Sequence, residues 1–434
     1  MANPRGHSGA GSDLSGAGTA PVERSHIDLS DPDFFADGPP HAAYRVLRDE
    51  APLYWHAPTD ATPDGEGFWC LTRHDDVTWA ATQPDVFSSA GGGGRAGGGT
   101  LIEDLPAGFA AGVLLNMQDD PRHHHIRRLV TPSVSPKRLR TMRAALEARC
   151  AEILGAAVAA GDIDFLVDVA AELPLQAIAS LLGIPQADRH FLLDWADATL
   201  DYDGRDPGAD SARSQAAASE MADYTRRLLD DKRHCPGDDI LSLVTRADLP
   251  AEADPGGPLS ELEQEMFVHL LVAAGSETTR NTITAGMLAL IERPDDWDAL
   301  RADRSLLPGA IEEMLRWASS TIYNRRTATR AVERHGQTIA PGDKVVLWWQ
   351  AANFDERVFT DPHRFDIRRD PNPHVAFGLG SHFCLGANLA RLEIALVFDG
   401  LLDRVPRPTA LGPAERTRSN KHAGYRHAPV CLRP

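Results

Sequence analysis

The chain has 434 residues, of which 42% are hydrophobic and 24% charged, the composition of a globular protein with ample length for a large core. Its formal net charge of -18 argues against a surface that binds nucleic acid or an anionic membrane, because both require a basic face. The five cysteines lie far apart and form no CxxC pair. We therefore expect neither a disulfide framework nor a zinc site, but reduced thiols as in the cytoplasm.

The first 25 residues are rich in Gly, Ser and Ala and contain no apolar segment of the kind found in signal peptides. This composition predicts a disordered tail. No apolar run elsewhere reaches the length of a membrane span, so we expect no membrane anchor. The sequence is thus interpreted as a tail, residues 1–25, followed by a single domain, residues 26–434, of a cytoplasmic protein.

Helical patterns dominate the middle of the chain, and strand-like runs occur nearer the ends, at 68–72 and 344–349. Two stretches resemble linkers in composition: 90–99, with seven glycines, and 249–258, which is rich in Pro and Gly. No second core pattern begins after either stretch. Both are therefore predicted to be surface loops within one domain.

Residues 121–146 form a basic stretch that contains three His and seven Lys or Arg but no Asp or Glu. One interpretation is that these are solvated helix charges. The other is a docking patch for an acidic partner, because long-range attraction speeds encounter. A metal-binding tract at His123, His124 and His125 is not expected, since adjacent helical positions point apart.

A long helix is predicted after Ser260, which forms a capping box with Glu263. The helical pattern ends before Pro294, about 32 residues and roughly 48 Å further on, and is apolar on much of its circumference. We expect it to cross the middle of the molecule. Near its centre, the Thr278 hydroxyl can bond the Ala274 carbonyl and open the helix locally. The alternative is a buried Ser/Thr patch that bonds only its own backbone.

The segment 377–386, FGLGSHFCLG, precedes an amphipathic helix and places Cys384 at the helix N-terminus. Unpaired N–H groups and the helix dipole favour a thiolate there. Its glycines let the backbone approach a flat ligand closely. Such a thiolate can ligate a haem iron. The alternative is a buried core cysteine in a glycine-rich loop.

This segment resembles the haem-binding loop of the cytochrome P450 family, FGxGxHxCxG, and the resemblance extends over most of residues 26–434. It implies a mainly α fold with small β-sheets: a triangular prism with the haem between the long central helix and the Cys384 loop with its following helix. The implied activity is that of a haem-thiolate monooxygenase. Such an enzyme hydroxylates or epoxidises a hydrophobic molecule with O2 and two electrons, with haem b as cofactor.

The resemblance also implies site residues. The run 274–279, AGSETT, is similar to the family's oxygen-binding segment, so Glu277 and Thr278 are the predicted catalytic residues that relay protons. His123 and Arg127, one helical turn apart, would bind haem propionates together with two further matches. The predicted cofactor-binding set is Cys384, the axial iron ligand, with His123, Arg127, Arg326, His382, Phe377, Gly378, Ala274, Gly275 and Gly386.

A structural network is implied by the motif ExxR at Glu313 and Arg316, which share a helix face about 70 residues before Cys384. By resemblance, Arg364 is its third member. The chain departs from the family pattern at His124 and His125, which replace Thr-Arg, and at Phe354, which replaces a common Arg. These departures leave the predicted catalytic set unchanged.

No flavin or iron–sulfur motif is present, so the predicted electron source is a ferredoxin with an NAD(P)H-dependent reductase, docking near Arg122–Arg143. The runs 274–284, 353–359 and 372–391 resemble actinobacterial enzymes that hydroxylate sterols, steroids and methyl-branched lipids. The expected substrate is a steroid or sterol, a terpenoid or a branched lipid, and a tailoring reaction on a polyketide, peptide or antibiotic is the alternative. Substrate contacts are expected at 88–116 and 195–215, with 90–99 as a mobile entrance.

Two other classes of function are not expected. A catalytically silent P450-like activator would be expected to lack Cys384. A haem sensor would need an output domain, and no segment resembles one. A peroxide-driven variant would be expected to alter the acid–threonine pair, which is intact at Glu277 and Thr278.

Overall fold

The central helix α9 (Glu261–Ile291) organises the computed structural model, which describes residues 23–199 and 212–433. Its capping box is present as predicted: the Glu263 N–H donates to Ser260 Oγ at 3.2 Å, and the Ser260 N–H donates to Glu263 Oε2 at 2.8 Å. The helix ends before Pro294, which begins α10 (Pro294–Ala302). The predicted tail 1–25 lies almost wholly outside the described residues.

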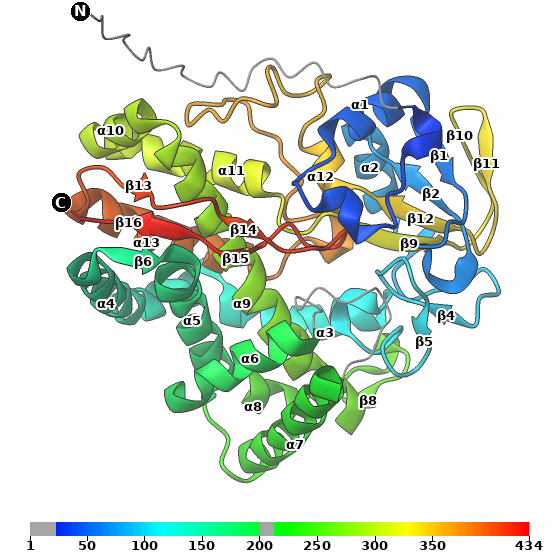
Figure 1. The fold of residues 1–434 in the computed structure, drawn as a ribbon. Helices are drawn as coiled ribbons and strands as arrows, with labels where there is room; N and C mark the ends of the chain where they lie inside the picture. Colours follow the sequence, from blue (N-terminus) through cyan, green and yellow to red (C-terminus); the bar gives the residue numbers. More distant parts are fainter. Residues whose placement is uncertain (1–22, 200–211, 434) are drawn as a thin grey trace, which may run out of the picture.

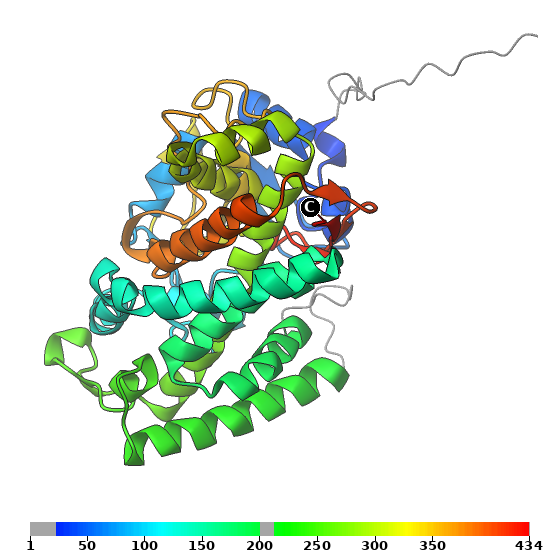
Figure 2. The same ribbon diagram turned by 90° about the vertical axis from the view of Figure 1, so that its left-hand side faces the viewer.

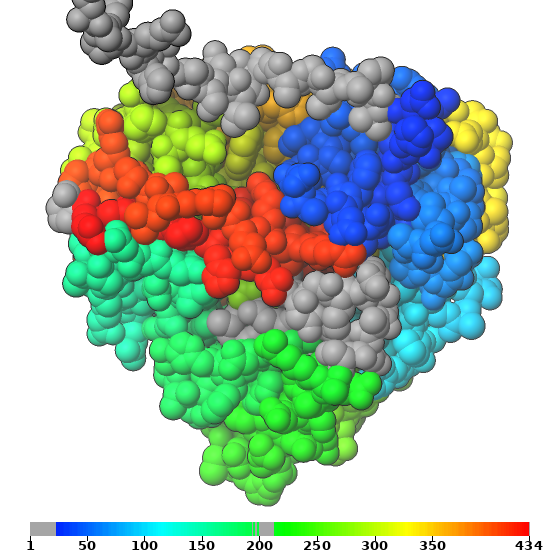
Figure 3. All heavy atoms as spheres, in the orientation of Figure 1, coloured from blue at the N-terminus to red at the C-terminus, as the bar shows by residue number. Residues whose placement is uncertain are grey.

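Helices surround α9 and leave a triangular outline, which Figures 1 and 3 show from the same side. The mainly α prism predicted from the sequence is confirmed. One face of α9 packs against α5, and α4 lies along α13, the helix that follows Cys384 (Figure 2). The helices packed around the core are α3 (Arg122–Val130), α4 (Pro136–Ala160), α5 (Glu172–Leu182), α6 (Arg189–Thr199), α7 (Ala212–His234), α8 (Ile240–Val244), α11 (Leu307–Ala318) and α13 (Ala387–Arg404).

The largest sheet lies at one corner of the prism, beside α1 (His41–Glu50) and α2 (His74–Ala81). Its strand order is β1-β2-β12-β9-β3, with bounds Leu53–His56, Phe68–Leu71, Lys344–Leu347, Asn324–Ala328 and Phe87–Ser88. The predicted strand 344–349 is two residues too long. It ends at Leu347 because the backbone turns at Trp348 into the short helix α12 (Trp349–Ala352), whose Ala351 carbonyl accepts a bond from Arg48.

The remaining strands form small sheets. The strand at the end of the chain, β16, lies in the middle of a three-stranded sheet whose order is β13-β16-β6. The bounds of the small strands are Asp162–Asp164 (β6), Thr409–Ala410 (β13), Pro429–Cys431 (β16), Val332–Arg334 (β10), Gln337–Ile339 (β11), Glu415–Arg416 (β14), Tyr425–His427 (β15), Gly97–Gly98 (β4), Leu105–Pro106 (β5), Asp248–Leu249 (β7) and Gly257–Pro258 (β8). Among the residues that the structure describes, no helix has the length and apolarity needed to cross a bilayer.

Glu313 and Arg316 on α11 form a fully buried ion pair, with nitrogen–oxygen distances of 2.8 Å. The third member of this network is Arg369, whose Nε donates to Glu313 Oε2 at 3.1 Å. The prediction of Arg364 was wrong. The Arg364 residue is exposed and contributes only its carbonyl, which accepts bonds from Arg369 and Arg316. Phe354, which replaces an Arg common in the family, packs against this network. Its buried ring lies 4.9 Å from the Arg316 guanidinium.

The two arginines give a matched pair of variants. We predict that Arg369→Ala lowers the free energy of unfolding by about 3 kcal/mol, because it removes a charge partner from the buried Glu313 carboxylate. Arg364→Ala should change it by less than about 0.5 kcal/mol, as expected for an exposed side chain. Urea unfolding followed by tryptophan fluorescence measures both. Equal losses in the two variants would contradict the assignment of Arg369.

Candidate functional site

Cys384 lies in a tight loop between a 3-10 turn, Gly380–His382, and the start of α13. Its N–H donates to the Phe377 carbonyl at 2.8 Å, which closes the loop. Gly378 and Gly380 have φ of +67° and +71°, a region that side chains disfavour. A Cβ at Gly380 would also lie 2.4 Å from the Ala81 carbonyl oxygen. These glycines are thus required by the path of the backbone.

The charge state of Cys384 depends on opposing effects. Burial raises the pKa of the thiol, while a hydrogen bond from the Gly386 N–H and the positive charges of Arg127 and Arg391 lower it. Burial prevails, so the pKa lies above its ordinary value. The Gly386 N–H at the start of α13 acts in the predicted direction, because it favours the thiolate. A bound metal cation would supply the missing stabilisation of the thiolate.

A second ionic group braces the Cys384 loop, and the sequence analysis missed it. Arg391 on α13 donates to both oxygens of Glu312 on α11 at 2.7 Å, and the His374 ring lies 3.0 Å from the same carboxylate. The Arg391 guanidinium also lies 4.6 Å from the centre of the Phe377 ring. The available signal was the pair of adjacent acids, Glu312 and Glu313, in the ExxR helix. Each one holds a different part of the chain that leads to the cysteine.

Four basic side chains gather beside this loop from three separate elements. His123 on α3 lies against His382, with ring centres 4.0 Å apart, and Arg127 donates to the Phe383 carbonyl. Arg326 on β9 is buried and donates to the Arg325 carbonyl at 2.9 Å. Burial and the charges of Arg326, His123 and Arg127 lower the pKa of His382 to about 2, so the four side chains share one region.

This cluster has the character of an anion site. Within the described part of the chain, neither Arg127 nor Arg326 forms an ion pair, although burial lowers the pKa of Arg326 to about 10. His123 alone has an acidic partner, with its Nδ1 at 3.1 Å from Asp120. Buried cations without carboxylates are costly unless an anion joins them. The donor set therefore fits the two propionates of a haem whose iron faces Cys384.

The central segment of α9 presents different faces to different neighbours. Ala274 is exposed although it lies midway along the helix, and the Thr278 hydroxyl donates to its carbonyl at 3.1 Å, as predicted. The helix nevertheless continues unbroken from Glu261 to Ile291. Gly275 is turned toward α5, where an added Cβ would lie 3.0 Å from the Ile178 side chain. Its small size is thus explained by helix packing.

Glu277 is buried on α9 and is held by polar contacts. Its Oε1 accepts from Asn281 Nδ2 at 3.2 Å and lies 3.3 Å from His422 Nδ1. Two residues further along α9, Thr279 bonds Glu393 on α13, and burial raises the pKa of that carboxyl to about 8. Neither His422 nor Glu393 was identified from the sequence, because both contacts join segments far apart in the chain.

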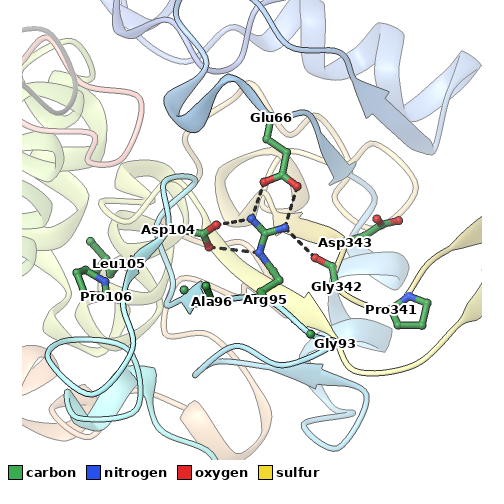
Figure 4. Close-up of a pocket in the computed structure, with 12 residues that line it drawn as sticks. Glu66, Gly93, Arg95, Ala96, Asp104, Leu105, Pro106, Pro341, Gly342 and Asp343 are labelled. Carbon is green, nitrogen blue, oxygen red and sulfur yellow. Dashed lines mark hydrogen bonds and ion pairs between the residues drawn. The ribbon is translucent and has the colours of Figure 1, made fainter.

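The glycine-rich stretch 90–99 is held by charges at the edge of an open groove of about 620 Å³ (Figure 4). Arg95 pairs with Glu66 and Asp104, and it donates to the Gly342 carbonyl at 3.1 Å. Close backbone approach accounts for Gly93, whose added Cβ would lie 2.1 Å from the Gly342 nitrogen. The mobility of 90–99 stays a prediction, and opening this loop would have to break the contacts of Arg95.

Comparison with known proteins identifies the family. A model described as cytochrome P450 matches residues 205–405. Cytochrome P450 126 of Mycobacterium tuberculosis is 47% identical over 411 residues, which cover 94% of this chain and 98% of that protein. Steroid C26-monooxygenase of Rhodococcus jostii is 38% identical, covering 91% of this chain and 82% of the relative. Methyl-branched lipid omega-hydroxylase of Mycobacterium tuberculosis is also 38% identical, covering 95% and 96%.

The solved structures agree. A cytochrome P450 of Mycobacterium marinum in complex with pseudoionone superposes with a TM-score of 0.84 at 33% identity, covering 96% of this chain and 100% of that chain. The chain belongs to the cytochrome P450 family. It is an oxidoreductase of the monooxygenase type that uses haem. Among the described residues, no group of three or more His, Cys, Asp or Glu is arranged to hold a metal ion.

The contacts of Glu312 with Arg391 and His374 predict that the free energy of unfolding depends on pH. Its bonds to Arg391 and His374 lower the pKa of Glu312 from 4.5 to about 2 in the folded protein. A depressed pKa stabilises the fold above the unfolded value and loses that effect as pH falls through the window from about 4.5 to about 2. Wild type should therefore be more stable than Glu312→Gln at about pH 6, and the difference should shrink below about pH 4. Urea midpoints across this range measure the effect, and a constant difference would contradict it.

Proposed function

We propose that this monooxygenase hydroxylates steroids or methyl-branched lipids with electrons delivered by a ferredoxin. The haem site rests on one observation above all, the four basic side chains that surround the Cys384 loop with a single acidic partner among them. The substrate class rests on relatives named for steroids and methyl-branched lipids, which match nearly the whole chain at 38% identity. The substrate titration described below distinguishes steroids and methyl-branched lipids from terpenoids and from the substrates of tailoring enzymes.

The Cys384 thiolate would hold the haem iron, with the Gly386 N–H, Arg127 and Arg391 stabilising its charge. His123, Arg127, Arg326 and His382 would hold the propionates. When bound, the haem supplies reductive activation of O2, which protein side chains cannot provide. Gly378, Gly386 and Phe377 would shape the surface against which the macrocycle lies, and Ala274 would leave room above it.

Glu277 and Thr278 are the proposed catalytic residues, and their task is to move protons. Thr278 is anchored by its bond to the Ala274 carbonyl, which fixes the direction of its hydroxyl. Glu277 lies beside it with its carboxylate already bonded to Asn281, so it is turned toward the interior contacts of α9. An acid and a hydroxyl held on successive residues can take part in successive proton transfers.

Only some cations of the basic stretch 121–146 are available for docking a partner, because three of them already form ion pairs. Arg122 pairs with Glu263, Arg138 with Asp238 and Arg143 with Glu147. In the described structure, Arg128, Lys137 and Arg140 are exposed and form no ion pair. We call these three residues the proximal patch. Beside the patch, α3 reaches the Cys384 loop through Arg127 and Phe383, whose ring is 39% exposed. Exposed cations around an apolar centre suit an acidic ferredoxin.

A spectral titration with a small panel tests the substrate class. We expect testosterone or a methyl-branched fatty acid to shift the haem spectrum at lower concentration than palmitic acid, an unbranched control, and to yield an oxygenated product. Pseudoionone represents the terpenoid alternative. Cys384→Ala should lose the red-shifted carbon monoxide band that thiolate ligation produces. Retention of that band in the variant would contradict the ligand, and tight binding of palmitic acid alone would contradict the substrate class.

The proximal patch gives a prediction of its own. Reversing Arg128, Lys137 and Arg140 to Glu should slow ferredoxin-supported turnover about tenfold at low salt, because charge steering is lost, and less at high salt. Substrate titrations should be unchanged. The matched control reverses Arg213, Arg227 and Arg330, which are exposed on α7 and after β9 and change the net charge equally. Equal slowing by both triple variants would show a bulk charge effect and no patch.

A further inference from the structure

The turn between β14 and β15 brings the C-terminal segment against the catalytic part of α9. The Ile322 N–H donates to the Lys421 carbonyl at 3.0 Å, and the Ala423 N–H donates to the Ser320 carbonyl at 2.9 Å. Ser320 in turn donates through its Oγ to the Thr278 carbonyl at 3.1 Å. The turn is therefore joined to the residue that the proposed mechanism uses.

Within this turn, His422 lies next to the carboxylate of Glu277, with 3.3 Å between His422 Nδ1 and Glu277 Oε1. Asn281 fixes the geometry from both sides, because its Nδ2 donates to Glu277 Oε1 at 3.2 Å and its Oδ1 accepts from the Tyr425 N–H at 3.4 Å. Gly424 is required at its position, since an added Cβ would lie 2.9 Å from Asn281 Nδ2. The ring and the carboxylate are thus held at a set distance.

His422 also lines a small cavity of about 10 Å³, roughly the room that one water molecule occupies. The cavity lies between the C-terminal turn and the N-terminal segment near Gly38, which meet on the face seen in Figure 3. Its polar lining includes Gln350, which is buried, and Arg416, which is exposed. His422 therefore touches a buried carboxylate and a site for water.

The protonation state of the His422 ring is suited to proton transfer. Burial, together with the positive charges of Lys421 and Arg280, lowers the pKa of His422 to about 3. The imidazole is therefore neutral near pH 7, with one nitrogen as donor and the other as acceptor. Lys421 itself is turned elsewhere, since its Nζ donates to the Tyr323 carbonyl at 2.6 Å and the Thr100 carbonyl at 3.3 Å. A neutral ring can accept a proton at one nitrogen while it releases one from the other.

We propose that His422 resupplies Glu277 with protons from water in this cavity, so that solvent reaches the acid–threonine pair through the C-terminal turn. In each step, a hydronium proton from bulk water passes through the cavity water to His422 Nε2 while the Nδ1 proton passes to Glu277 Oε1, and before the next step the ring loses the Nε2 proton to water and regains one at Nδ1. Bulk water restores the cavity water, and no electrons move. His422 acts through Glu277 and contacts neither substrate nor haem. The proposal rests on the proposed role of Glu277 in proton delivery.

The test measures hydrogen peroxide released per NADPH consumed in the holoenzyme with a ferredoxin and its reductase. Pseudoionone serves as probe, with a parallel assay without added ligand. His422→Ala should raise the peroxide fraction several-fold, as Glu277→Gln should, because slow protonation diverts electrons to peroxide. Added imidazole should restore His422→Ala but not Glu277→Gln. The matched control is His427→Ala, whose ring is exposed and lies 2.7 Å from Asp164.

A second variant separates relay from positioning. His422→Gln retains an amide that can bond Glu277 but cannot transfer protons, so it should behave as His422→Ala does. Wild-type coupling in His422→Gln, or failure of imidazole to rescue His422→Ala, would overturn the relay. If Glu277→Gln raises the peroxide fraction and His422→Ala does not, the relay is wrong while the role of Glu277 stands. If Glu277→Gln itself has no effect, the proposed proton role of Glu277 fails, and the relay with it.

Discussion

Two adjacent carboxylates on α11 hold the part of the chain on which the haem site depends. Glu313 turns inward to Arg316 and Arg369, and it also accepts from the Asp366 N–H at 2.9 Å. Its neighbour Glu312 turns to His374 and Arg391, on either side of the cysteine loop. Adjacent residues on a helix point in different directions. Glu312 and Glu313 can therefore bind both the irregular chain before Cys384 and the helix after it. The position of the thiol is therefore set by buried charge on another element.

The balance of charge inside the protein differs from the balance over the whole chain. The net charge is -18, yet Arg316, Arg325, Arg326 and Lys344 are buried, three of them paired with carboxylates. Arg326, which pairs with none in the described residues, lies where the cofactor carboxylates are expected. Six carboxylates and six Lys or Arg side chains are buried among the described residues, so the interior does not share the negative excess of the whole chain. The same reasoning explains why the Cys384 thiol has a raised pKa until a cation binds it.

The sequence predicted features whose partners lie within a few residues. The capping box at Ser260, the Thr278 bond to Ala274 and the pair of Glu313 with Arg316 all follow from spacing on one helix. The choice of Arg364 over Arg369 failed because both lie in irregular chain, where spacing does not determine direction. Gly275 was assigned to the haem site, yet it faces Ile178. The contacts of Glu277 with His422 and of Glu312 with Arg391 join segments that spacing alone cannot relate.

The position of β16 in the sequence limits when its sheet can form during synthesis. Residues 429–431 form the middle strand of a sheet whose outer strand β6 was synthesised more than 250 residues earlier. Until residues 429–431 have emerged from the ribosome, β6 and β13 have no strand between them. Glu313 likewise emerges long before Arg369 and Arg391 can reach α11. Native assembly of this sheet therefore has to wait for residues 429–431, so a chain stalled or truncated before them would expose unpaired strand edges and depend on chaperones.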